Sequence, residues 1–215
     1  DFPHHEFNEL GYHSLINGQK SYNGVCFLVK NPSKILAKSI PQLEDEQKRI
    51  IATKYNDIFV VNAYVPNGMA VGSDKYQYKL TWLKSFFKWI KKVTENENKI
   101  IIMGDFNITP SNRDVYDPEA HKDKILCSDA ERSYITSLAE IGISDMFHTI
   151  NNKEDQFSWW DYRGGSFRQN KGFRIDLILT SDALKSRVKN YYIDRAPREW
   201  EKPSDHAPVI MEIKS

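Results

Sequence analysis

Seven short segments rich in β-branched and aromatic residues recur along this sequence and constrain its fold more than any other feature. Each has the length and composition of a β-strand, and several are bounded by Gly, Pro or Asn, as turn chemistry requires. These segments do not alternate strictly with helices, which favours β-sheets packed face to face with helices outside over a doubly wound parallel sheet. The predicted strands are Asn23–Lys30, Ile50–Tyr55, Ile58–Val65, Lys99–Gly104, Gln156–Tyr162, Arg174–Ser181 and Pro208–Ile213.

Two segments have the periodicity of amphipathic helices. Within Tyr76–Val93, apolar residues recur at three- and four-residue intervals and form one face. In the second segment, Ser128 and Glu131 form a capping box at the start, and Gly142 is placed to end the helix. We therefore predict two helices that lie outside the sheets.

Length and composition indicate one globular domain over residues 1–215, because no linker, repeat or low-complexity block interrupts the sequence. The 30 basic and 29 acidic residues give a formal net charge of +1, which excludes general attraction to nucleic acid but allows a local basic stripe. Cys26 and Cys127 lie in no zinc-binding or disulfide pattern, which is typical of a reduced compartment. No apolar run approaches the roughly 18 residues of a membrane helix.

An acidic and an amide residue follow the most apolar of the predicted strands. The run Ile100–Met103 is typical of a strand buried on both faces, and Gly104 ends this pattern. Asp105 and Asn107 stand two positions apart, and a period of two places their side chains on one side of the carboxyl end of the strand. Such a pair could activate and orient a small polar group, or could belong to an ordinary turn.

Two more acids and a histidine lie nearer the end of the chain. Asp205 and His206 precede a terminal apolar strand; the carboxylate suits Mg²⁺ and the imidazole suits phosphate, although a surface loop is the simpler alternative. Asp176 lies between Ile175 and Leu177, where an unpaired charge is costly. Its partner is either an arginine, which indicates a structural role, or a histidine such as His206, which it would orient.

Aromatic and basic residues are interleaved in the segment before Asp176. Trp159 stands in an aromatic run, and Arg163, Arg168 and Lys171 follow it across a glycine-rich stretch. Nucleic-acid grooves use such aromatic residues for stacking and such cations for phosphate contact. Core aromatics beside a solvated loop would give the same pattern, and the glycine-rich loop slightly favours a binding surface.

Taken together and in this order, the motifs resemble those of the exodeoxyribonuclease III family of apurinic/apyrimidinic (AP) endonucleases, within the endonuclease/exonuclease/phosphatase superfamily. Lipid- and inositol-phosphate members share the short motifs at Asp105 and at Asp205, whereas the Trp159 motif indicates the DNA-repair branch. The matching stretches run from near the first residue to near the last: Gly18–Val25, Tyr64–Gly68, Gly104–Pro110, Arg113–Pro118, Phe157–Trp159, Arg174–Asp176 and Glu201–Pro208.

The resemblance implies a four-layer α/β sandwich, in which two packed mixed β-sheets are flanked by helices and the active site lies at one end. Asp105 would activate the attacking water or protonate the leaving oxygen, and Asn107 would orient the phosphate. Tyr64 and His206 would contact the scissile phosphate, with His206 held by Asp176.

The resemblance also implies a metal and DNA-binding surfaces. The metal would be Mg²⁺, with Mn²⁺ as an alternative, bound by Asp205 and with Asp105 and Asn107 as further candidate ligands. An apolar pocket for a flipped-out abasic sugar would be formed by Trp159, Phe173 and Ile175. An abasic nucleotide is cheap to extrude because no base pairing holds it. The candidates for contact with the DNA backbone are Lys20, Arg163, Arg168 and Lys171.

The function implied is that of a Mg²⁺-dependent DNA-repair nuclease that incises duplex DNA 5′ to abasic sites. It would also act as a 3′–5′ exonuclease and trim blocked 3′ ends, as a monomer in the cytoplasm, associated with the nucleoid if bacterial, and without a membrane partner. One alternative is a phosphodiesterase or phosphatase acting on lipid or inositol phosphates. The other is a DNA-binding fragment with impaired catalysis.

The sequence departs from the family pattern at its beginning. Family members start with a strand that carries an Asn near the site, followed by a strand that supplies the principal metal-binding Glu. The match here begins after that point, at Asp1–Pro3, and Glu6 and Glu9 lie in a polar, helix-like stretch that does not replace it. We therefore expect the N-terminal strands of the fold to be absent from this sequence.

Overall fold

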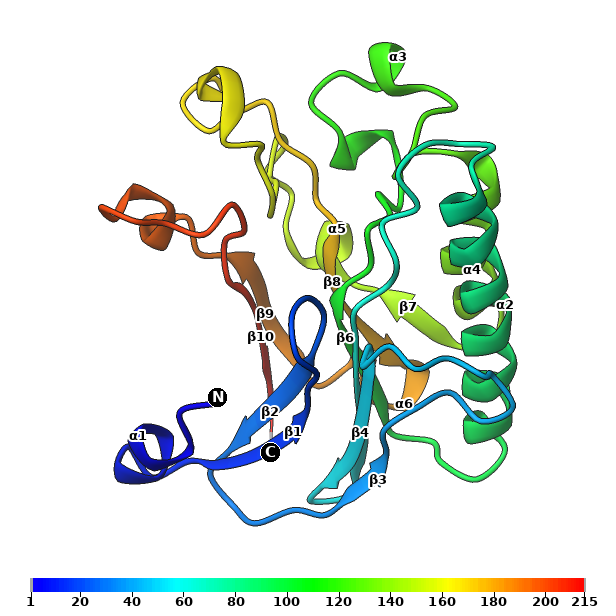
Figure 1. Cartoon of the computed structure of the whole chain (residues 1–215), viewed down its shortest axis with the longest axis vertical. Helices are drawn as coiled ribbons and strands as arrows, with labels where there is room; N and C mark the ends of the chain where they lie inside the picture. The colour runs from blue at the N-terminus through cyan, green and yellow to red at the C-terminus, as the bar shows by residue number, and fades with distance from the viewer. Residues whose placement is uncertain (1, 215) are drawn as a thin grey trace.

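A six-stranded mixed β-sheet runs through the middle of the computed structural model, which describes residues 2–214 (Figure 1). Its strand order is β3–β4–β5–β6–β8–β7, with β5 and β6 parallel and the other neighbours antiparallel. The strands are β3 (Ile35–Ala37), β4 (Ile50–Tyr55), β5 (Ile58–Ala63), β6 (Ile100–Asp105), β7 (Ile143–Asp145) and β8 (Asp176–Ser181).

Two smaller antiparallel sheets lie on one side of the large sheet, and two long helices lie on the other (Figure 1). The small sheets pair β1 (His13–Asn17) with β2 (Val25–Val29) and β9 (Val188–Ile193) with β10 (Val209–Ile213). The long helices are α2 (Asp74–Thr94) and α4 (Asp129–Glu140). The shorter helices are α1 (His4–Glu9), α3 (Pro118–His121), α5 (Phe147–Ile150) and α6 (Asp182–Lys185), with 3₁₀ turns at Asn112–Asp114, Arg163–Gly165 and Ala196–Glu199.

Alternation along the strands of the large sheet divides its apolar residues between two cores. Ile100 and Ile102 pack toward the helices with Trp82, whereas Ile101 packs toward the small sheets with Phe27. This two-sided burial follows from the period of two in a strand and explains why the segment reads as continuously apolar. The expected α/β sandwich, with sheets facing each other and helices outside, is confirmed.

Both predicted helices are confirmed, with their capping signals. Helix α2 extends beyond Tyr76–Val93 by a few residues, because Ser73 caps it by accepting from the backbone N–H of Tyr76. The Ser128–Glu131 capping box forms in full at the start of α4, and Gly142 adopts a positive φ of 82° just after its end. No helix within residues 2–214 combines the length and apolar character that a membrane span requires.

One predicted strand is wrong, and four short strands (β1, β3, β7 and β9) were not predicted. Gln156–Tyr162 makes only isolated bridges at Trp159, to Phe173 and to His206. The backbone N–H groups of Ser158 and Trp159 both donate to the carbonyl of Phe173, so this segment folds against the approach to β8 and does not join a sheet. Phe157 and Trp160 of this segment are buried in the core on the side of the small sheets, whereas Trp159 is only partly buried.

Candidate active site

Asp105 and Asp176 lie directly opposite each other where β6 ends and β8 begins. The neighbouring Gly104 has a φ of 133°, and a Cβ atom there would lie 2.1 Å from the carbonyl oxygen of Ala63. Only glycine permits this close approach, which lets the backbone of Val65 donate to the carbonyl of Asp105 at 2.9 Å. The glycine thus brings the segment that carries Tyr64 against the end of β6.

Asp105 and Asn107 form a closed pair through two hydrogen bonds. The backbone N–H of Asn107 donates to Oδ1 of Asp105 at 2.8 Å, and its side-chain amide donates to Oδ2 at 3.0 Å. Asn107 is buried and has a φ of 49°, so it lies in a turn beyond the strand. The functional and turn interpretations of this motif are therefore compatible, because the turn itself directs the amide to the carboxylate.

Asp176 is paired with histidine, not with arginine. Oδ2 of Asp176 accepts from Nδ1 of His206 at 2.8 Å and from the buried hydroxyl of Ser158 at 2.7 Å. A carboxylate at Nδ1 fixes the orientation of the ring and leaves Nε2 to face another group. The arginine alternative is excluded because Arg174 bonds Asp114 and Asp145.

Asp205 joins the same region through Trp159. The indole Nε1 of Trp159 donates to Oδ2 of Asp205 at 2.9 Å, and the backbones of Trp159 and His206 form a bridge. The backbone of Ala207 also donates to the carbonyl of Ser158 at 2.7 Å. The Ser158–Trp159 segment therefore fastens the Asp205–His206 turn to the end of the large sheet.

The shifted pKa values indicate that these groups act on one another. Burial and the charge of Asp176 raise the pKa of Asp105 to about 7. Burial by itself lowers the pKa of His206, but the hydrogen bond and charge of Asp176, with Asp105 and Asp205, raise it to about 9, so the imidazole is protonated at neutral pH. Burial and the charges of Asp105 and Asp205 raise the pKa of Tyr64.

Oxygen ligands for a metal ion come from few side chains here. Asp105, Asp205 and Asn107 offer the hard oxygen atoms that Mg²⁺ prefers. Among residues 2–214, no three acidic, histidine or cysteine side chains are grouped so that they could hold a metal ion by themselves.

Trp159 and Phe173 line a pocket of about 450 Å³ together with Arg163 and Lys171. The rings of Trp159 and Phe173 are 5.8 Å apart, and Phe173 is largely buried. Ile175 lies deeper, in an apolar cluster against which Trp159 packs. Two of the expected aromatic residues, Trp159 and Phe173, therefore lie in the same pocket as two of the expected cations, Arg163 and Lys171.

Lys20 and Arg168 lie apart from the Trp159 pocket. Lys20 lines a separate hollow of about 690 Å³ with Arg49 and Met69, between the β1–β2 loop and the loop after β5. Arg168 is exposed in the loop that also carries Arg163. The predicted DNA-backbone residues are therefore spread over more than one patch.

Sequence reasoning missed several side chains that hold the site. Ser158 bonds Asp176, and the guanidinium of Arg49 lies 4.9 Å from the ring centre of Tyr64. Lys79 is fully buried and pairs with Glu131. A signal for Lys79 was present, because it occupies the apolar face of α2 three positions after Tyr76 and four before Leu83.

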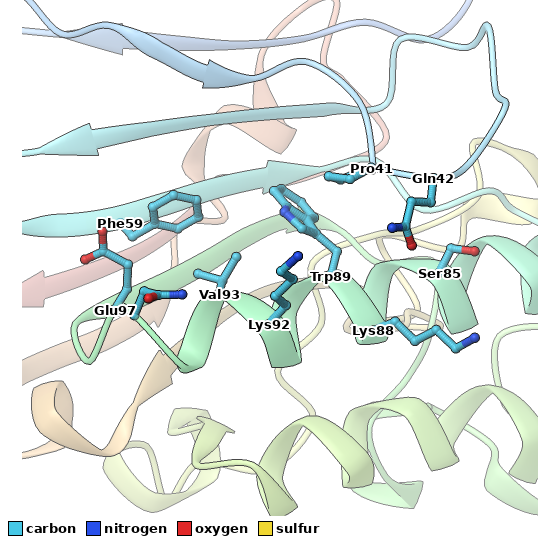
Figure 2. Close-up of a pocket in the computed structure, with 10 residues that line it drawn as sticks. Pro41, Gln42, Phe59, Ser85, Lys88, Trp89, Lys92, Val93 and Glu97 are labelled. Atoms are coloured by element: carbon cyan, nitrogen blue, oxygen red, sulfur yellow. The ribbon is translucent and has the colours of Figure 1, made fainter.

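A further pocket of about 480 Å³ lies between the C-terminal half of α2 and the start of β5 (Figure 2). Phe59, Trp89 and Val93 form its apolar part, and its one acidic residue, Glu97, is paired with Lys54. Phe59 is opposite Ile100, at the end of β6 that is remote from Asp105. This pocket therefore does not belong to the acid–histidine site.

Comparison with known proteins agrees with this geometry. The Endonuclease/Exonuclease/phosphatase family model matches residues 2–206. Exodeoxyribonuclease III of Haemophilus influenzae is 36% identical over an alignment that covers 99% of this chain and 85% of that protein.

Two solved structures also match over 100% of this chain and 84% of theirs. A 3′ phosphatase from Neisseria, bound to a product DNA hairpin, is 35% identical with a TM-score of 0.97. An AP endonuclease from Archaeoglobus fulgidus is 30% identical with a TM-score of 0.94. Similarity of this extent shows that the chain belongs to the endonuclease/exonuclease/phosphatase family, as a homologue of exodeoxyribonuclease III and hence a nuclease.

Proposed function

We propose that this nuclease hydrolyses phosphodiester bonds of duplex DNA, incises the strand 5′ to abasic sites, and removes nucleotides and blocking groups from 3′ ends. The observation that carries the proposal is the meeting of the Asp105–Asn107 and Asp176–His206 pairs at one end of the large sheet, beside the Trp159 pocket. The Neisseria relative is described as a 3′ phosphatase and the Archaeoglobus relative as an AP endonuclease, which supports both parts of the proposal.

The proposed roles follow from what each group can donate or accept. Asp105 takes a proton from the attacking water or returns one to the departing 3′ oxygen, while the amide of Asn107 orients the phosphate. His206, held at Nδ1 by Asp176, donates to a phosphoryl oxygen on which charge develops. The hydroxyl of Tyr64 is a second donor to the same phosphate.

The proposed metal ion is Mg²⁺, with Mn²⁺ as a substitute. Asp205 would hold it, with Asp105 and Asn107 as further ligands, because their carboxylate and amide oxygen atoms suit the ion and Asp176 is already paired with His206. Bound there, the ion would neutralise charge on the phosphoryl oxygens. The residues themselves position the phosphate and move the protons.

The proposed DNA contacts use the two kinds of side chain that surround the site. Trp159 and Phe173, with Ile175 packed behind them, form the apolar wall that accepts an extruded abasic sugar, which lacks the stacking that retains an ordinary nucleotide. The cations that contact phosphates are Lys20, Arg163, Arg168 and Lys171. We further propose that the protein acts as a monomer in the cytoplasm, on nucleoid DNA if the source is bacterial.

The deciding experiment uses a labelled duplex that carries one tetrahydrofuran abasic analogue, incubated with the protein in Mg²⁺ or in EDTA. We expect a single nick 5′ to the analogue in Mg²⁺ and none in EDTA. Parallel reactions contain a 3′-phosphate duplex and inositol phosphates. Binding without nicking would indicate a DNA-binding protein without catalysis, and hydrolysis of inositol phosphates with an intact duplex would overturn the DNA assignment.

A further inference from the structure

The structure assigns a positioning role to the buried ion pair between Lys79 and Glu131. We propose that this pair, shared by α2 and α4, holds the Asn107 turn in the geometry needed for phosphodiester cleavage. The kinetic part of this inference rests on the proposed function, whereas the positioning itself does not.

Lys79 is enclosed by acceptors from three parts of the chain. Its side chain and that of Glu131 are fully buried. The Nζ atom donates to the carbonyl of Asn107 at 2.6 Å, to the carbonyl of Asn67 at 3.1 Å, and to Oε1 of Glu131. An ammonium group has three protons, so these three acceptors saturate it.

The two carbonyls that Lys79 binds belong to asparagines that are themselves joined. Nδ2 of Asn67 donates to Oδ1 of Asn107 at 2.8 Å, and Nδ2 of Asn107 donates to Asp105. Asn107 has a left-handed φ of 49°, a region that asparagine enters more readily than most residues, so its turn needs further contacts to fix it. Lys79 contacts this turn from the helix side through the carbonyl of Asn107, while Asp105 bonds its backbone N–H and its amide from the strand side.

Helix packing alone does not explain why this pair is charged. Apolar side chains of similar volume would hold two helices together as well as a buried ion pair does, and often better. Glu131 also accepts hydrogen bonds from the backbone N–H groups of Leu126 and Ser128, and these bonds stabilise the start of its own helix, α4. Lys79 makes no hydrogen bond from its Nζ atom within α2, so its bonds connect the helices to the site turn.

The test replaces both charges at once, because removing one would leave the other buried and unpaired. Lys79→Met combined with Glu131→Gln removes the donor to Asn107 and keeps an acceptor for the capping bonds of Glu131. Lys84→Met is the matched control, because Lys84 is an exposed lysine on the same helix. A thermal unfolding scan confirms that each variant is folded at the assay temperature.

The first readout is kinetic and uses the abasic duplex. We expect kcat of the double variant to fall by about 10- to 100-fold, as for a misplaced reacting group, with a much smaller change in KM. In an Asn107→Ala background, the same double substitution should cause little further loss, because the group that it positions is already absent. Full additive losses in that background, or an unchanged kcat, would overturn the inference.

The second readout does not depend on activity. In protein labelled with ¹⁵N at asparagine, the side-chain amide signals of Asn107 are identified by their loss in Asn107→Ala. We expect these signals to shift and exchange faster in the double variant but not in Lys84→Met. Unchanged signals contradict the positioning role even if the wild type proves inactive, whereas an inactive wild type with shifted signals contradicts the proposed function alone.

Discussion

Two ionic clusters meet at the start of β8, and they differ in how many of their acids bond a basic side chain. In the matched cluster, both Asp114 and Asp145 bond Arg174, whereas in the open cluster, of Asp105, Asp176 and Asp205, Asp176 bonds His206. Arg174 is fully buried and bonds Asp114 at 2.7 Å and Asp145 at 2.6 Å, while His148 also bonds Asp114. Burial alone would raise the pKa of Asp114, but the charge of Arg174 and hydrogen bonds from His148, Arg174 and Ser111 lower it to about 2.

The second cluster begins two residues later with Asp176. It contains Asp176, Asp105 and Asp205 but one imidazolium, that of His206, and it is partly open to solvent. Here burial and the charge of Asp176 raise the pKa of Asp105 to about 7. Arg174 and Asp176, two residues apart in the sequence, therefore serve different ends. The acids paired with Arg174 join parts of the fold, while the acids around Asp176 that lack a basic partner lie where a substrate and a cation can complete the site.

The largest expected effect separates the clusters by activity. Asp105→Asn should lower the rate of nicking by about 10²- to 10⁴-fold, because it removes the group that transfers the proton. Affinity for the abasic duplex and the free energy of unfolding should stay near the wild-type values. Single-turnover nicking and fluorescence anisotropy measure this, with the exposed Asp123→Asn as control. Near-normal turnover would show that the assignment is wrong.

A comparable effect on stability should appear in the matched cluster. Arg174→Met leaves Asp114 and Asp145 buried without their partner, which should reduce the free energy of unfolding by about 3–5 kcal/mol. Urea denaturation measures this, and the exposed Arg168→Met should change stability by less than about 0.5 kcal/mol. A small loss for Arg174→Met would mean that the cluster does not hold the fold together.

Acid should weaken the matched cluster over a defined pH range. Because the folded pKa of Asp114 is about 2 and its ordinary value is 3.8, its charged form favours folding above pH 3.8, and this contribution is lost as the pH falls toward 2. The stability difference between wild type and Asp114→Asn should therefore shrink by about 2 kcal/mol across this range. Urea titrations at pH 5, 4, 3 and 2 test this, and a constant difference would refute it.

The smallest effect concerns selectivity at the open cluster. Trp159→Ala should reduce the preference for an abasic site over an ordinary nucleotide by about tenfold, because the pocket loses an apolar wall. Trp159→Phe keeps a ring but loses the indole donor to Asp205, so it separates the wall from the hydrogen bond. Competition assays with abasic and intact duplexes measure the preference, and an unchanged ratio in Trp159→Ala would remove this residue from the pocket.

Much of the fold could be predicted because the relevant signals are local. The apolar run before Asp105 becomes the buried strand β6, and the Ser128–Glu131 box caps α4 as expected. The Gln156–Tyr162 segment was wrongly predicted as a strand because its aromatic residues have strand propensity. Its backbone N–H groups at Ser158 and Trp159 donate instead to the carbonyl of Phe173, outside any sheet. The strands β3 and β7 were missed because three residues give little periodicity.

The members of the candidate site could be predicted, whereas the residues themselves left the partner of Asp176 open between arginine and histidine, and only the family resemblance favoured His206. The acids and the histidine stood out as polar residues at the ends of apolar strands, and the family resemblance supplied their roles. Whether Asp176 pairs with arginine or histidine depended on the antiparallel pairing of β6 and β8 and on the return of the chain at His206. The roles of Ser158, Lys79 and Glu131 in the site could not be predicted, because Ser158 bonds Asp176 and Lys79 bonds Asn107 and Glu131 across long stretches of sequence.

The amino-acid sequence by itself determined the two long helices, six of the strands and the residue types of the site, since propensity, periodicity and caps act over a few residues. Tertiary structure alone decided which charge faces which. Arg174 and Asp176 are both polar residues in one apolar stretch, yet contact with Asp114 matches the first, and contact with His206 assigns the second to the open cluster. Electrostatic environment depends on distance in space, and folding sets that distance.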